Sequence, residues 1–155
     1  MNSRPGFGLI HPVVLLAVVV LAVNDHWAKQ RWPGLITGKL SDVAGLAFFP
    51  LFLQAGWELF ASLRGPVVPS FRVARNAAIL TAVVFSAVKL FEPASLAYEW
   101  GLGLLRWPLD LTLRPVSLTR DPTDLLALPA LAISLLLARR RAHFGLRARF
   151  FTMDS

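Results

Sequence analysis

Residues 77–100, with the sequence AAILTAVVFSAVKLFEPASLAYEW, begin as an apolar run that suits a lipid bilayer and then carry Lys89 and Glu92. An ionisable residue inside a membrane helix costs roughly 2.5–3.5 kcal/mol to insert, so it usually faces protein or water and marks a functional site. Lys89 and Glu92 are three residues apart, on one helical face, and close enough to neutralise each other. The alternative to a functional site is a salt bridge between these two residues with no further role, or a Lys89 side chain that extends to the membrane surface.

The composition places the whole chain in the class of membrane proteins. Hydrophobic residues make up 55% of the 155 residues, charged residues only 16%, and the mean hydropathy is +0.58. A soluble domain is about 25% charged. The length predicts a single transmembrane domain over residues 1–155. Because the chain has no cysteine, disulfides and thiolate metal sites are excluded.

Four segments are predicted to cross the membrane, because each approaches the roughly 20 apolar residues that a transmembrane helix needs. Turn-rich stretches with proline and glycine separate these segments. The predicted fold class is therefore all-α, a polytopic membrane protein with a four-helix transmembrane bundle. A cleaved signal peptide is disfavoured for the first segment, because only Arg4 precedes it and no clean cleavage site follows. The predicted spans are residues 7–23, 43–63, 77–98 and 122–139.

Loop charge predicts that both termini lie in the cytoplasm, in a multi-pass protein of the inner (plasma) membrane. This topology places nine basic residues inside and six outside, in agreement with the positive-inside rule. Residues 140–155 are predicted to form a basic cytoplasmic tail. Arg139, Arg140 and Arg141 are predicted to contact anionic lipid of the inner leaflet. Since the +7 net charge is concentrated there, nucleic acid is not the expected partner.

With this topology, every segment brings polar groups to the outer half of the bundle. The first segment ends at Asn24, Asp25 and His26, and the other three bring lysine, arginine and carboxylates. Such mixed charge suits a phosphorylated or zwitterionic head group, with cations on the phosphate and carboxylates on amines or hydroxyls. The candidate ligand-binding residues are Lys39, Asp42, Lys89, Glu92, Arg114, Arg120, Asp121 and Asp124.

Several of these residues also have a structural explanation. Asp121 followed by Pro122 is a good helix start, and Ser41 could cap the second segment. Asp42 and Asp124 could stabilise a helix N-terminus and face inward as well. Glu58 and His11, near the cytoplasmic ends, are explained by pairing with each other or with Arg64. No paired-histidine motif is present, so no metal site or cofactor is predicted.

Three stretches resemble the VanZ-like family, small bacterial membrane proteins associated with low-level glycopeptide resistance. They are GKLSDVAGLAFFPL at 38–51, KLFE at 89–92 and RPVSLTRDPTDLLAL at 114–128. Chain length and the four-span layout agree as well. Asp42 stands near the place of the family's histidine, and Leu128 stands where the family has asparagine. The resemblance implies functional roles for Lys39, Arg114 and Asp124.

Three functions fit these observations. The first is a membrane protein whose outer charged cleft binds the head group of a lipid or cell-envelope precursor. The second is a small enzyme that acts on such a head group, with a carboxylate as acid or base beside Lys89. The third is an ion or proton pathway. The first is preferred, because no histidine or nucleophile stands beside the carboxylates. The third segment also offers only Thr81 and Ser86 toward the inner half. Faces rich in glycine and alanine also permit packing in a homo- or hetero-oligomer.

Overall fold

The computed structural model describes residues 7–28, 31–32 and 34–153. This part of the chain is entirely helical and contains no strand. Its elements are η1 (Phe7–Ile10), α1 (Pro12–Val23), η2 (Asn24–Ala28), α3 (Leu35–Ser62), α4 (Phe71–Leu90), α5 (Glu92–Asp110), η3 (Pro122–Ala130) and α6 (Leu131–Met153).

Three helical segments are long and apolar enough to cross a membrane, which indicates a membrane protein and confirms the all-helical class for the described residues. They are Ile36–Ser62, Phe71–Leu90 and Pro122–Ala142. The last agrees closely with the predicted span 122–139. The predicted first span corresponds to a shorter apolar segment, Pro12–Ala28, formed by α1 and η2.

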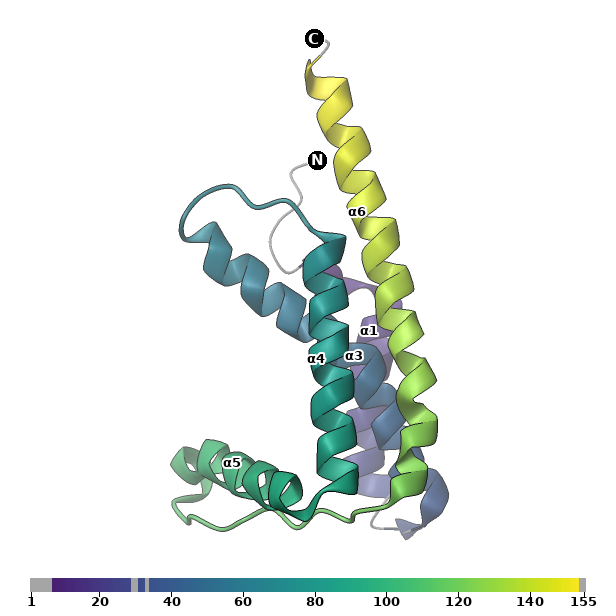
Figure 1. Ribbon diagram of the computed structural model, residues 1–155, viewed down its shortest axis with the longest axis vertical. Coiled ribbons are helices and arrows are strands. Elements are labelled where there is room, and N and C mark those ends of the chain that lie inside the picture. The colour runs from purple at the N-terminus through teal and green to yellow at the C-terminus, as the bar shows by residue number, and fades with distance from the viewer. Residues whose placement is uncertain (1–6, 29–30, 33, 154–155) are drawn as a thin grey trace.

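The helices α1, α3, α4 and α6 pack side by side (Figure 1). Large apolar side chains such as Phe52, Ile79 and Leu136 point away from the bundle. Lipid tails solvate large apolar side chains well, so membrane helices associate through small residues that allow close approach. The packing therefore suits a lipid surrounding. The buried apolar residues are mostly alanine: Ala44, Ala47, Ala55, Ala74, Ala77, Ala78, Ala127, Ala130 and Ala138.

The predicted third span, 77–98, is wrong at its second half. The helix α4 ends at Leu90, Phe91 is extended, and α5 begins at Glu92 with Pro93 in its first turn. Proline has no N–H to give to a helix interior but fits a first turn, so it starts a new helix here. Figure 1 shows α5 extending sideways from this end of the bundle, roughly perpendicular to α4. We call this the α5 end of the bundle.

The helix α5 is amphipathic, and the chain after it returns along its length. The backbone N–H of Val116 donates to the Glu99 carbonyl at 3.1 Å, and the N–H of Leu118 donates to Glu99 Oε1 at 3.0 Å. A Cβ on Gly103 would clash with the backbone oxygen of Arg114, so only glycine permits this approach. Large side chains remain exposed on α5: Leu96, Tyr98, Trp100, Leu104, Leu105 and Trp107.

The second predicted span, 43–63, starts too late. The helix α3 begins at Leu35, after Gly34, whose N–H donates to Thr37 Oγ1 at 3.2 Å. Ser41 is therefore inside the helix, and the prediction that it caps the second segment is wrong. Toward the C-terminus, α6 continues without a break to Met153, so the residues predicted to form a basic tail are part of the last helix (Figure 1). Residues 154–155 of that predicted tail lie outside the described residues.

Candidate functional site

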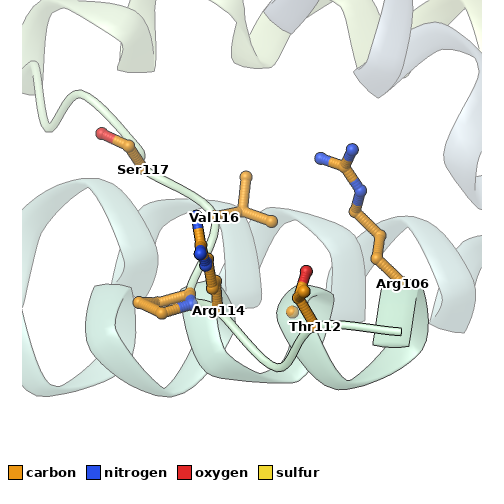
Figure 2. Close-up of a pocket in the computed structure, with 7 residues that line it drawn as sticks. Arg106, Thr112, Arg114, Val116 and Ser117 are labelled. Atoms are coloured by element: carbon orange, nitrogen blue, oxygen red, sulfur yellow. The ribbon is translucent and has the colours of Figure 1, made fainter. Parts of the chain in front are cut away.

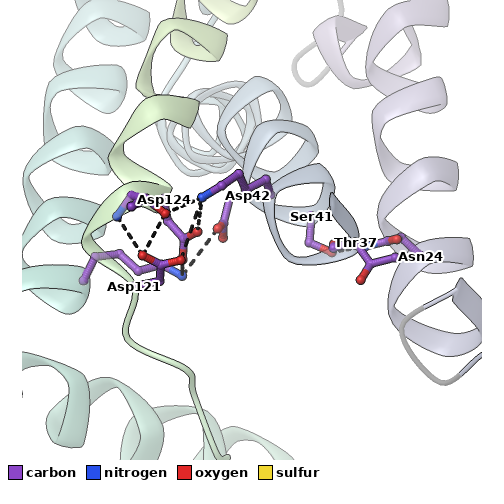
Figure 3. Close-up of polar contacts among 9 residues, drawn as sticks. Asn24, Thr37, Ser41, Asp42, Asp121 and Asp124 are labelled. Atoms are coloured by element: carbon purple, nitrogen blue, oxygen red, sulfur yellow. Dashed lines mark hydrogen bonds and ion pairs between the residues drawn. The ribbon is translucent and has the colours of Figure 1, made fainter. Parts of the chain in front are cut away.

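Five charged side chains from three helical segments meet at the α5 end; we call them the lysine–aspartate cluster (Figure 3). Lys89 Nζ lies 2.6 Å from Asp124 Oδ2 and 3.4 Å from Asp42 Oδ2. Lys39 Nζ lies 3.1 Å from Asp124 Oδ1 and 3.9 Å from Asp121 Oδ2. Asp124 therefore accepts from both lysines at once, and it joins α3, α4 and η3.

The start of η3 holds Asp124 in this position. Asp121 is the N-cap: its Oδ1 accepts from the backbone N–H and from the hydroxyl of Thr123, each at 2.8 Å. The predicted capping role of Asp121 is thus confirmed. These two hydrogen bonds, from the hydroxyl first and the backbone second, hold the pKa of Asp121 below its usual value. The Thr123 hydroxyl also contacts Lys39 Nζ at 2.6 Å, which ties the cap to the cluster.

The cluster is graded from buried to exposed. The side chains of Lys89 and Asp124 are only 7% and 10% exposed, whereas those of Asp121 and Lys39 are 27% and 31% exposed. Lys89 Nζ also lies 5.6 Å from the centre of the Phe85 ring. Two lysines face three aspartates, which leaves one negative charge in excess among these five groups. A buried charge is stable only with partners, so Lys89 and Asp124 are held in fixed positions. Lys39 and Asp121, which form the rim of the cluster, can exchange their present partners for groups of a ligand.

Three predicted site residues lie outside this cluster. Glu92 and Arg120 face each other at the surface, with Arg120 Nη2 3.6 Å from Glu92 Oε2. The expected pairing of Lys89 with Glu92 is therefore wrong: the helix break at Phe91 separates them, and Lys89 pairs with Asp42 and Asp124 instead. Arg114 lies in the segment that returns along α5 and lines a separate pocket there.

A buried asparagine supports the same part of α3. Asn24 Nδ2 donates to Ser41 Oγ at 2.7 Å and to the Thr37 carbonyl at 2.5 Å, in a group that Figure 3 shows beside the cluster. Its Oδ1 is buried without a hydrogen-bond partner in the described structure. Asn24 opens the π-helical turn η2, and such turns are frequent at functional sites. The sequence predicts Asn24 only as one of the polar groups at the outer half of the bundle and gives no signal for its bonds to α3. The side chain of its neighbour Asp25 lies outside the described residues.

A second buried charged group lies toward the other end of α3. Arg141 of α6 donates to Glu58 through two hydrogen bonds, at 3.1 Å and 3.3 Å, and Gln54 Nε2 donates to Glu58 Oε1 at 2.9 Å. We call Glu58 and Arg141 the glutamate–arginine pair. The expected partner Arg64 instead stacks on Phe60, with its guanidinium carbon 4.8 Å from the ring centre. His11, the other expected partner, caps α1 by accepting from the Val13 N–H.

Comparison with protein-family models, with curated proteins and with solved structures finds no match for this chain. Among the described residues, no three histidine, cysteine or acidic side chains are grouped to hold a metal ion. The chemistry that the cluster offers is therefore that of its own groups: two ammonium donors and three carboxylate acceptors, held at graded depth.

Proposed function

We propose that this chain is a multi-pass protein of the plasma membrane whose lysine–aspartate cluster binds the head group of a lipid or cell-envelope precursor. Four spans, with both termini in the cytoplasm, place the cluster on the extracytoplasmic side. The VanZ-like resemblance supports the same assignment through Lys39 and Asp124. One observation carries the proposal: Asp124 holds two lysines in a cluster with an excess carboxylate and a half-exposed rim.

The aromatic residues support a position of this end at the membrane surface. Trp27 and Trp32 pack edge to face with ring centres 5.2 Å apart, and Trp100 and Trp107 are exposed on α5. The segments that carry these residues lie at the same end of the bundle (Figure 1). Tryptophan is enriched where membrane meets water, so this end matches the head-group region.

The charges of the cluster select a zwitterionic head group. Lys39 at the rim can donate to a phosphate oxygen, and Asp121 and Asp42 can accept from an amine. The groups of such a ligand replace the contacts that Lys39 and Asp121 make with each other. Because the ligand has no net charge, it adds none to a partly buried site, which limits the free-energy cost of desolvation on binding. Phosphatidylethanolamine has both groups and is a suitable probe.

The test is retention of phosphatidylethanolamine by the full-length protein, measured by native mass spectrometry in mild detergent. We expect Lys39→Gln to lower the retained lipid by about tenfold, because it removes one charge-assisted hydrogen bond at the rim. The matched control is Arg120→Gln, which removes an equal charge from the exposed Glu92 pair at the same end. Equal retention by Lys39→Gln and the wild type would refute the proposal.

A further inference from the structure

A second polar site lies between α5 and the segment that returns along it. A pocket of about 270 Å³ opens there, with Arg106, Thr112, Arg114 and Ser117 as its polar lining (Figure 2). We call it the arginine pocket. It shares no residue with the lysine–aspartate cluster. Figure 2 shows Arg106 on α5, and Thr112, Arg114 and Ser117 on the segment that returns along it.

The backbone builds this pocket. Leu111 ends α5 in the left-handed region, with φ 53°, and reverses the chain. The close approach at Gly103 then sets Arg114 against α5, and the hydrogen bond from Val116 to Glu99 holds it there. A left-handed leucine is unfavourable and persists only where its surroundings require it. The position of Arg114 beside α5 is therefore fixed by the return of the chain.

We infer that the arginine pocket binds a phosphate group. Two guanidinium groups and two hydroxyls line it. The planar fork of arginine matches phosphate oxygens with two parallel hydrogen bonds, and the hydroxyls of Thr112 and Ser117 can donate to the remaining oxygens. A volume just below the usual 300–1,000 Å³ of small-molecule sites suits one phosphate group with a short attachment.

The surroundings of the pocket favour a lipid as the source of that phosphate. The exposed side chains of Trp100, Leu104, Leu105 and Trp107 give α5 a broad apolar surface beside the arginine pocket. An amphipathic helix of this composition lies in the plane of the membrane surface, at the depth of the head groups. The pocket thus meets phosphate esters there, and an anionic lipid such as phosphatidic acid offers the phosphate without an amine.

The test is titration of the full-length protein in detergent with short-chain phosphatidic acid, followed by native mass spectrometry. We expect Arg106→Gln with Arg114→Gln to weaken binding by about tenfold or more, because charge-assisted hydrogen bonds are lost. The matched control is Arg72→Gln with Arg75→Gln, two exposed residues of α4 with the same change in net charge. The control should stay within about twofold of the wild type.

A third variant separates shape from charge. Gly103→Ala keeps every charge but pushes the return segment away from α5, so it should also weaken phosphatidic acid binding. Competition by inorganic phosphate identifies the source: displacement of the lipid at similar concentrations assigns the site to free phosphate, and no displacement assigns it to lipid. Wild-type affinity in the Arg106/Arg114 variant, or an equal loss in the Arg72/Arg75 control, would overturn the inference.

The outcome is independent of the proposed function. The arginine pocket is tested by loss of phosphatidic acid in the Arg106/Arg114 variant, whereas the lysine–aspartate cluster is tested by loss of phosphatidylethanolamine in Lys39→Gln. Loss in Lys39→Gln with full binding in the Arg106/Arg114 variant would refute the arginine pocket and leave the lysine–aspartate cluster standing.

Discussion

The glutamate–arginine pair and the lysine–aspartate cluster both place buried charge on α3, but they are built differently. Glu58 and Arg141 join one carboxylate to one guanidinium through two parallel hydrogen bonds, and the Glu58 carboxylate is almost fully buried. The cluster has five groups of unequal exposure and unequal charge. A balanced and closed pair fixes α6 against α3. An unbalanced and open cluster can exchange partners, which is what a binding site requires.

The largest effect is expected at the glutamate–arginine pair. Arg141→Gln removes a charge-assisted pair of hydrogen bonds from the buried Glu58 carboxylate, and breaking a buried pair in this way costs roughly 3–5 kcal/mol. The free energy of unfolding in detergent measures the loss. Glu58→Leu with Arg141→Leu should recover most of it, because well-packed apolar residues replace a buried pair without penalty. Failure to recover would mean that the pair does more than join two helices.

A smaller loss of stability is expected in the cluster, with a loss of binding beside it. Lys89→Met removes the donor between Asp42 and Asp124 and should cost about 2 kcal/mol of unfolding free energy, since Asp124 keeps Lys39 and Asp42 is partly exposed. Adding Asp42→Asn should restore stability but not retention of phosphatidylethanolamine. If the double variant regains both its stability and its retention of phosphatidylethanolamine, the cluster has only a structural role, like the glutamate–arginine pair.

The smallest effect is expected at the rim of the cluster. The pKa of Asp121 is lowered in the folded protein by its bonds to Thr123, so its contribution to stability is present above its ordinary pKa and is lost as the pH falls through the lower folded value. Asp121→Asn keeps the cap but cannot titrate, so its melting temperature should fall less than that of the wild type on acidification. Parallel acid profiles for the two proteins would contradict this assignment.

The sequence was sufficient to predict the class and the part of the site that depends on helix ends. Each residue of the lysine–aspartate cluster lies near one end of an apolar segment. Because consecutive membrane-spanning segments alternate in direction, these ends meet on the same side of the membrane. Pro122 after Asp121 marked the start of the last helix correctly. These signals depend only on neighbouring residues in the sequence, which is why they predicted the helix ends correctly.

The parts that could not be predicted depend on competition between local signals or on distant partners. Pro93 disfavours a helix interior, but the apolar residues around it favour a continuous span; the proline prevailed, and it separated Glu92 from Lys89. Glu58 had Arg64 nearby in sequence, yet its partner Arg141 lies 83 residues away. Only the packing of α6 on α3 creates that pair, and no spacing in the sequence records it.

The position of Lys89 has a consequence for the order in which the protein is made. Its two carboxylate partners come from an earlier helix and from a later one. During synthesis, α4 enters the bilayer with Asp42 already present and with Asp124 still to be translated. An ammonium group in hydrocarbon is costly until it is neutralised. Lys89 therefore has both carboxylate partners only after the last helix has entered the bilayer. In a polypeptide truncated before Asp124, Lys89 would keep Asp42 as its one partner of the two.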